Sequence, residues 1–377
     1  MKALILTLLL ASPAPAAPPE VEKELAVAVT RIYDLEFDAA ERACAEFGAK
    51  HPGHPGAPFY AAVVAYQRWI TEGMVSPAAY AAVESRLAET ERAAQALLPK
   101  EPALANYYLG AAHGFQARAH AGRRRFVKAV PAASAAVRHL NKALALDPTL
   151  DDAALGLGMY HYFGARMPSG ARPFAKLLAG EAPDKDRGLA MLRRVAASHG
   201  TAREEARSVL AMILSREGAE GWAEADALLA ELVARHPRNP LFRLRRAWLA
   251  AKRGDYDRSI ELYDAEGRWP DEHADPLRSR VRAWALYRAA EVRALQGRGH
   301  ETDRLLDRLD GLALPKGVKD WALLRRGNAR DLAGDHAAAA RAYAAVQDKA
   351  ARALARRYLR APFPAGPVEF MPFFTGY

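Results

Sequence analysis

The chain has 377 residues, which is more than a single compact core usually holds. Its composition is 51% hydrophobic and rich in the helix formers Ala, Leu and Arg, which favours an all-α fold. The formal charge of +10 is concentrated between residues 236 and 360, which contain 27 Lys and Arg and 17 Asp and Glu. The only cysteine is Cys44, so an intramolecular disulfide is excluded.

Residues 1–16 have the pattern of a secretory signal peptide. Lys2 is followed by an apolar run over residues 3–11, which is far shorter than the ~20 residues that span a bilayer. Small residues around Pro15 predict cleavage after Ala16. We therefore expect an exported mature protein, periplasmic or secreted. The alternative is that the run is an apolar first helix.

Residues 17–200 form the first predicted region, built from helix pairs. Residues 21–52 predict one pair, with small, aromatic and apolar slots filled by Ala40, Cys44 and Phe47. Helices over 59–71 and 77–98 follow, and Ser76 is the expected N-cap of the second, ahead of a proline in its first turn.

Residues 103–148 predict a hairpin longer than its neighbours. Gly110 and Pro148 are 38 residues apart, about 14 more than the usual repeat allows, so each helix gains roughly two turns. The run Arg123-Arg124-Arg125 then lies near the protruding tip. It suits either contact with an anionic surface or a solvated tip, and the second interpretation is the simpler one.

Residues 151–200 repeat this pattern and contain an insertion. Leu157, Gly158 and His161 match the spacing of a Leu-Gly-x-x-His group in the preceding hairpin, and no strand precedes the glycines as a phosphate loop would require. The Pro- and Gly-rich insertion spans 164–187 and contains a predicted short helix over 174–178.

Residues 201–360 are the most regular array. Small residues on successive first helices are spaced by 36, 43 and 37 positions: Ala211, Ala247, Ala290 and Gly327. Residues 349–360 predict a capping helix, which an open array requires. In the tail, residues 361–377, we expect four aromatics to pack back on the array: Phe370, Phe373, Phe374 and Tyr377.

At these residues the chain resembles the tetratricopeptide repeat superfamily, most clearly in residues 320–346, DWALLRRGNARDLAGDHAAAARAYAAV. The middle region resembles the long-helix branch that includes tetratricopeptide repeat domain 39-like proteins. The resemblance implies a TPR-like solenoid of helical hairpins, a right-handed superhelix of about seven to eight helix pairs with a C-terminal capping helix. Each unit then packs only on its neighbours. It also implies a protein-binding scaffold or adaptor and no chemistry.

Motifs for catalysis are not found in the sequence: HExxH, GxSxG, Walker-type loops and paired Cys-x-x-Cys are missing. The acidic pairs at 151–152 and 204–205 stand at predicted helix starts, where they complement the helix dipole. His161 lies on an apolar helix, which is typical of a buried, hydrogen-bonded histidine, while His51 and His54 lie in a loop. We expect no enzyme activity, metal or cofactor.

The concave face of the array is the expected binding groove. By the resemblance, defined first-helix slots line it. In the C-terminal array these slots hold Arg245, Trp248, Trp284, Tyr287, Arg288, Trp321, Arg325 and Asn328, and in the middle region they hold Tyr107, Phe115, Met159 and Tyr162. Trp, Tyr and Arg dominate binding energy at interfaces, and Arg suits a carboxylate. The alternative is that the tryptophans pack between helices.

Two functions remain open from the sequence. The first is an exported adaptor that binds a protein or extended peptide in the groove, with an acidic segment as one candidate. The second is an envelope-associated assembly or docking factor that contacts anionic lipid or polysaccharide through the basic C-terminal half, residues 236–360. Because the arginines are scattered around the helices and form no single stripe, a solvated helix surface also explains the charge. No nucleic-acid partner and no transmembrane segment are expected.

Overall fold

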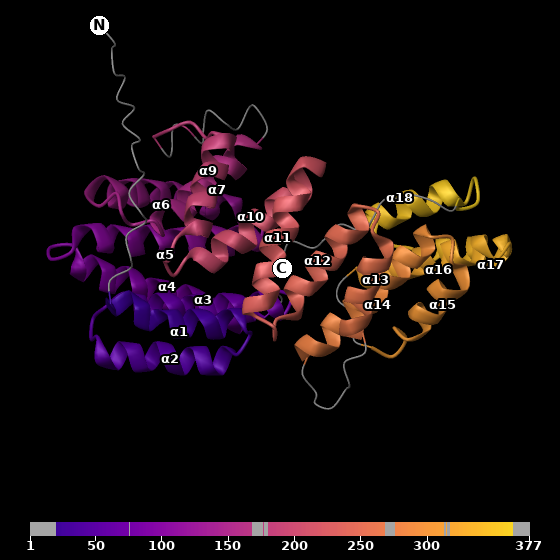
Figure 1. Ribbon diagram of the computed structural model, residues 1–377, viewed down its shortest axis with the longest axis horizontal. Coiled ribbons are helices and arrows are strands. Elements are labelled where there is room, and N and C mark those ends of the chain that lie inside the picture. Colours follow the sequence, from indigo (N-terminus) through magenta and orange to yellow (C-terminus); the bar gives the residue numbers. More distant parts are fainter. Residues whose placement is uncertain are drawn as a thin grey trace, which may run out of the picture. The chain divides into compact units, whose positions relative to one another are not determined.

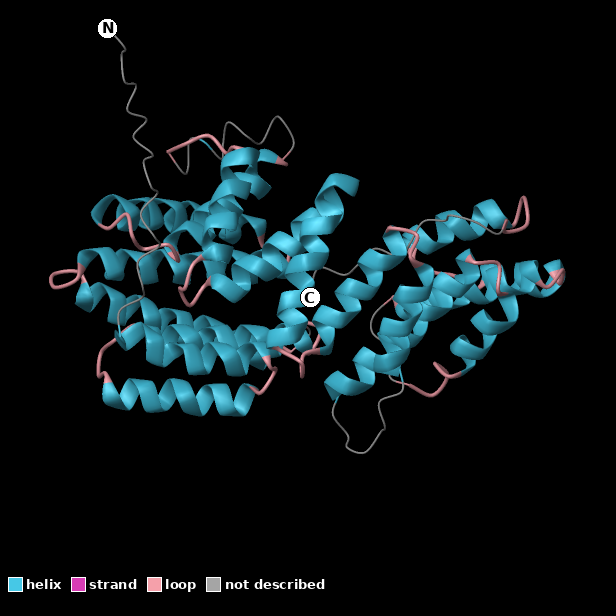
Figure 2. Cartoon of the chain, in the orientation of Figure 1, coloured by secondary structure: helices cyan, strands magenta, loops and turns pink. Residues whose placement is uncertain are grey.

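The computed structural model describes residues 20–364, except 75, 168–175, 177–179, 268–275, 313 and 315–316. Over these residues the chain forms helices and turns, and Figure 2 shows no strand among them. The predicted signal peptide, the predicted short helix within the insertion and the four tail aromatics lie outside the described residues, apart from the single helical residue Lys176. Their predictions therefore stay predictions.

Along the chain, the first and second helices of successive pairs alternate (Figure 1). Their bounds are α1 Glu20–Tyr33, α2 Phe37–Lys50, α3 Gly56–Thr71, α4 Pro77–Leu97, α5 Pro102–Gly122, α6 Phe126–Leu146, α7 Ala153–Ala165, α9 Lys185–Ala197, α10 Arg203–Glu217, α11 Ala219–Arg235, α12 Pro240–Lys252, α13 Tyr256–Gly267, α14 Pro276–Leu295, α15 Gly299–Asp307, α16 Val318–Leu332, α17 His336–Ala344 and α18 Lys349–Tyr358.

Consecutive helices pack as hairpins, for example α5 on α6, α7 on α9, α12 on α13 and α16 on α17. In chain order the described helices make eight pairs, and α18 packs on both α16 and α17. This architecture confirms the prediction of an all-α, TPR-like array of helix pairs with a C-terminal capping helix.

Small residues at the predicted positions allow the two helices of a pair to approach closely. A Cβ added at Gly327 of α16 would overlap the ring of Tyr343 in α17. Ala211, Ala247 and Ala290 are likewise fully buried. The interhelix turns also match their sequence signals, since Gly334 has a φ of 79°, a conformation that favours glycine.

Capping residues explain several helix starts. The Oγ of Ser76 accepts a hydrogen bond from the backbone N–H of Ala79 at 3.1 Å, as predicted. Asp335 caps α17 and Asp348 caps α18 in the same way. These local signals lie within three residues of the groups they satisfy, which is why a cap such as Ser76 can be predicted from the sequence.

The chain divides into two compact units, which we describe separately. Unit 1 comprises 1–32, 37–64 and 82–209, and unit 2 comprises 33–36, 65–81 and 210–377. Unit 2 thus combines segments far apart in sequence. Within it, Asn239 donates from Nδ2 to the carbonyl of Tyr33 at 2.7 Å. An array in which each hairpin packs only on its neighbours does not predict this contact.

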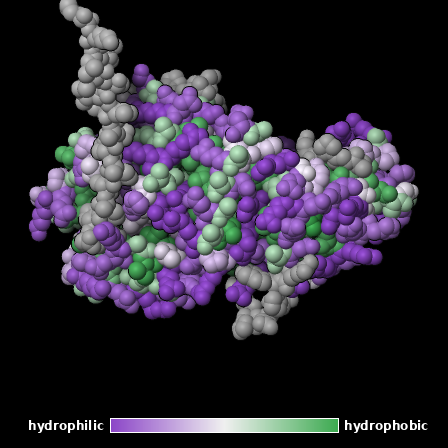
Figure 3. Space-filling model, in the orientation of Figure 1, coloured by the Kyte–Doolittle hydropathy of each residue, from purple (hydrophilic) through white to green (hydrophobic). Residues whose placement is uncertain are grey.

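The visible surface is largely hydrophilic, with hydrophobic residues in small separate patches (Figure 3). Within the described ranges no helix is long and apolar enough to cross a membrane.

Candidate binding surface

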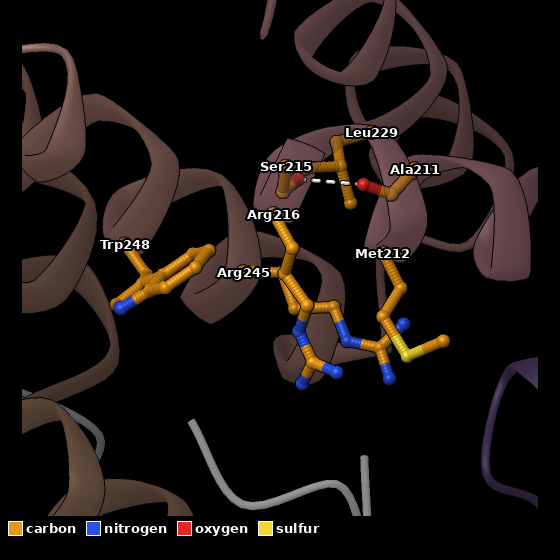
Figure 4. A pocket seen from close by; sticks show the side chains of 7 residues that line it. All are labelled: Ala211, Met212, Ser215, Arg216, Leu229, Arg245 and Trp248. Carbon is orange, nitrogen blue, oxygen red and sulfur yellow. Dashed lines mark hydrogen bonds between the residues drawn. The ribbon is translucent and has the colours of Figure 1, made fainter. Parts of the chain in front are cut away.

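Residues of unit 2 on three helices enclose a pocket that contains two of the predicted groove residues. The pocket has a volume of about 300 Å³, part of it open to solvent. Its lining residues are Ala211, Met212, Ser215 and Arg216 of α10, Leu229 of α11, and Arg245 and Trp248 of α12. In Figure 4 the guanidinium groups of the two arginines point the same way, into the space between the sulfur of Met212 and the indole of Trp248.

Positive charge concentrates around this pocket. Lys252, which is one turn after Trp248 on α12, places Nζ 4.9 Å from the centroid of that indole and 5.6 Å from that of Trp222. Its Nζ donates to the carbonyl of Ser215 at 3.3 Å. Burial and, second, the charge of Arg216 lower the pKa of Lys252. No carboxylate is among the lining residues.

The pocket is held by contacts behind its walls. Arg246 donates from Nε to Oδ1 of Asp226 at 2.7 Å, which fixes α12 against α11. Sequence reasoning identified Arg245 and Trp248 but missed Arg216 and Lys252. Arg216 and Lys252 each lie five residues after the small residue of their helix, Ala211 and Ala247 respectively. The alignment of the repeats could therefore have identified both cations.

The predicted groove residues of α14 and α16 lie elsewhere. Trp284 is partly buried, but five others are at most 3% exposed: Tyr287, Arg288, Trp321, Arg325 and Asn328. Their side chains face neighbouring helices and not solvent. This corrects the prediction that they line an open groove, and it supports the alternative that such residues pack between helices.

A buried carboxylate explains where these arginines point. Both oxygens of Glu291, which is fully buried, accept hydrogen bonds: from Nη1 of Arg288 at 2.6 Å and from Nη2 of Arg325 at 2.7 Å. The hydroxyl of Tyr287 donates to the same group at 2.9 Å. Burial, the largest single effect, lowers the pKa of Arg325, but the charges and hydrogen bonds of Glu291 and Tyr287 together outweigh it, so the net effect raises this pKa. The cluster ties α14 to α16.

The network continues through α16 into the last hairpin. Asn328 accepts from Nη1 of Arg325 at 3.0 Å and donates from Nδ2 to the hydroxyl of Tyr343 at 2.9 Å. That hydroxyl donates to Oδ2 of Asp331 at 2.7 Å, and the same oxygen accepts from the backbone N–H of Phe363 at 2.8 Å. Polar side chains here organise the C-terminal end of the fold.

The four predicted residues of the middle region belong to unit 1 and are not part of the pocket. Tyr107 and Tyr162 are buried, which again corrects the prediction that they line an open groove. Phe115 and Met159 are partly buried. The ring of Phe115 lies 4.9 Å from the guanidinium of Arg118, which forms an ion pair with Glu205 at 2.8 Å.

Histidines and acids outside the pocket have structural partners. The backbone N–H of Asp184 donates to Nδ1 of His161 at 3.2 Å, so this buried histidine is hydrogen-bonded as predicted. Asp151 forms an ion pair with Arg194 at 2.6 Å. Among the described residues, no group of three or more His, Cys, Asp or Glu that could hold a metal ion occurs.

Ion pairs neutralise part of the positive charge of the basic C-terminal half. Examples are Arg326 with Asp307 at 2.8 Å, Arg293 with Glu301 at 3.0 Å and Arg258 with Glu261 at 2.8 Å. The excess of 27 Lys and Arg over 17 Asp and Glu in residues 236–360 remains.

No protein-family model matches the sequence, and no curated protein matches it either. Among solved structures, the chain is similar to the APC/C hetero-tetramer Cut9-Hcn1, with a TM-score of 0.28 and 12% identity over 90% of this chain and 80% of that one. It is similar to yeast Tom70 with a TM-score of 0.27 and 11% identity over 89% and 87%. Likeness at this level carries no argument about function.

Proposed function

We propose that this protein is a non-catalytic scaffold that binds a protein partner, and that the pocket between α10 and α12 takes an acidic residue of an extended segment. The observation that carries the proposal is the convergence of Arg216 and Arg245 beside Trp248 in one pocket. A guanidinium group binds a carboxylate through two parallel hydrogen bonds. The indole and Met212 suit an apolar neighbour of that acid.

The chemistry of the pocket favours binding over catalysis. Its lining contains no His, Cys, Asp or Glu that could transfer a proton near neutral pH. Arginine and tryptophan, in contrast, are the residue types that most often dominate the energy of a protein interface. Since the pocket is small, we expect it to hold one side chain of the partner while neighbouring first helices contact the rest.

Export is a separate part of the proposal. Its support is the sequence of residues 1–16, with a positive start, a short apolar run and small residues before the cleavage position. The intact mass of the protein recovered from the periplasm or medium tests it. The expected species begins at Ala17, and a cytoplasmic species that retains Met1 contradicts export.

Binding is tested with a defined peptide probe. A fluorescein-labelled twelve-residue peptide that alternates Glu with Leu is titrated with the mature protein, and a peptide with Gln in place of Glu is the control. The double variant Arg216→Gln/Arg245→Gln should weaken binding of the acidic peptide by roughly 100-fold or more, because each arginine loses at least one charge-assisted hydrogen bond that contributes about 1.5–3 kcal/mol.

The matched variant is Arg258→Gln, which removes a surface arginine of unit 2 outside the pocket. It should bind as the wild type does, since exposed ion pairs contribute little. Equal affinity of the pocket variant and the wild type, or equal affinity for both peptides, would contradict the assignment of the pocket.

A further inference from the structure

The turn between α5 and α6 exposes cationic and apolar side chains together. We call the following residues the hairpin tip: Arg123, Arg124, Arg125, Phe126, Val127, Lys128 and Val130. Phe126 is 61% exposed and Val127 is 90% exposed. In the described part of the chain only eight large hydrophobic residues are exposed, and three of them fall within the five residues 126–130. Such clustering is typical of an interaction site.

The sequence around the hairpin tip carries one sign of charge. Between Glu101 and Asp147 there are seven Lys and Arg residues and no Asp or Glu. Four of these cations lie within residues 123–128, and all four are exposed. The apolar side chains are therefore surrounded by cationic side chains.

The length of α5 and α6 places the hairpin tip at one end of this helix pair. Helices α5 and α6 have 21 residues each, as does α4, whereas α7 and α9 have 13 each. Eight extra residues add ~12 Å of helix relative to α7 and α9. Every residue from 121 to 128 is exposed, so no other described helix covers this end.

The backbone also opens the tip. Arg124 has a φ of 58°, so the chain turns sharply between the helices. Pro131 lies in the second turn of α6 and has no N–H to donate to the carbonyl of Val127. The first turn of α6 therefore lacks one of its helical hydrogen bonds, and a polar group from outside can reach that carbonyl.

We propose that the hairpin tip docks on an anionic lipid bilayer. Phe126 and Val127 lie at the boundary between headgroups and acyl chains, and the four cations contact lipid phosphates. The apolar pair selects this partner: a polysaccharide or a free phosphate would engage the arginines and leave both apolar side chains in water. The tip belongs to unit 1, so the inference does not rest on the pocket of unit 2.

The first test measures co-sedimentation of the mature protein with vesicles at low salt. Vesicles of phosphatidylcholine and phosphatidylglycerol at 7:3 are compared with pure phosphatidylcholine. The variant Arg123→Gln/Arg124→Gln/Arg125→Gln should lose roughly 100-fold in partition coefficient on the anionic vesicles, since each cation near such a surface contributes about fivefold. The matched variant replaces three exposed arginines near the C-terminus, Arg356, Arg357 and Arg360, by Gln and should partition as the wild type does.

The second test separates insertion from simple charge attraction. Phe126→Ser/Val127→Ser should weaken partitioning about tenfold or more. The control Leu146→Ser/Leu359→Ser removes two side chains that are 49% and 48% exposed outside the tip and should have no effect. Circular dichroism and thermal unfolding check that all four variants fold.

The third test places an environment-sensitive NBD label in the tip. Cys44 is buried, and burial raises the pKa of its thiol to about 12, so a cysteine introduced by Val127→Cys is labelled selectively. Its emission should shift to the blue on anionic vesicles. The control label at Lys142→Cys, 15 residues further along α6, should not shift because it lies about 22 Å from the tip.

The outcomes decide the proposal. Loss of binding in both tip variants with a blue shift only at position 127 supports bilayer docking. No vesicle binding, equal loss in the C-terminal arginine control, or an unchanged label at position 127 overturns it. If the wild type binds an immobilised acidic polysaccharide and not vesicles, the hairpin tip binds through charge alone, and a lipid bilayer is not its partner.

Discussion

Replacing Glu291 by Gln tests whether the buried arginines of α14 and α16 are structural. The substitution keeps the shape of the side chain but leaves the guanidinium groups of Arg288 and Arg325, which lie 2.6 and 2.7 Å from its oxygens, without this counter-charge. At an effective dielectric constant of 20, each attraction is about 4 kcal/mol. The neutral Gln avoids several kcal/mol of desolvation, so the expected loss in unfolding free energy is about 3–5 kcal/mol.

The assay is urea unfolding followed by tryptophan fluorescence and circular dichroism. The midpoint should fall while the slope stays constant, because the folded state remains as compact as before. The loss should persist in 1 M NaCl, since salt screens a buried cluster poorly. The matched variant Glu261→Gln breaks a pair whose side chains are 48% and 66% exposed, and it should change stability by no more than about 0.5 kcal/mol.

A second substitution sharpens the test. Adding Arg325→Met to Glu291→Gln removes one of the two uncompensated charges, so stability should recover by more than 1 kcal/mol relative to the single variant. A Glu291→Gln loss below 1 kcal/mol, or a double variant less stable than the single one, would refute the inference that these arginines stabilise the fold through Glu291.

Three further predictions concern buried positions. Gly327→Ala should lower the free energy of unfolding by about 1–3 kcal/mol, because the added Cβ overlaps the Tyr343 ring. The control Gly114→Ala should not destabilise the protein, because its Cβ meets nothing closer than 4.0 Å. Comparable urea midpoints for the two variants would contradict this packing. Cys44 should resist Ellman's reagent at pH 8 until the protein is denatured, because burial raises its pKa to about 12; rapid reaction of the native protein would contradict its burial. Burial lowers the pKa of His54 from 6.5 to about 4, so between these values the unfolded chain binds a proton that the folded chain excludes, and stability should decrease as the pH falls through this window. His54→Asn should flatten that dependence, and an unchanged slope would assign it to other groups.

Local signals explain why the order of helices was predictable. Ser76 caps α4 through a contact three residues away, and Gly334 ends α16 with a positive φ. Small and aromatic residues at fixed offsets, such as Gly327 and Tyr343, also identify the two faces that meet within a hairpin. All these effects act within about one repeat, so they can be read along the chain.

The candidate site was only partly predictable for the same reason. A period of 3.6 residues places Arg245, Arg288 and Arg325 at equivalent positions of successive first helices, but it does not tell whether that face meets water. Arg245 lines a pocket, while the other two are buried. The difference follows from a fully buried carboxylate on α14, Glu291, which attracts both of them.

The helices, a cap such as Ser76, the hairpin pairing and the small positions at which helices meet are predictable from the sequence, because each depends on residues close together in the chain. The burial of particular arginines, the position of Arg216 beside Arg245, and the contact of Tyr33 with Asn239 across more than two hundred residues are visible only in the folded chain. Burial depends on how close a neighbouring helix comes, and that distance is set by packing between elements, which helical periodicity does not encode.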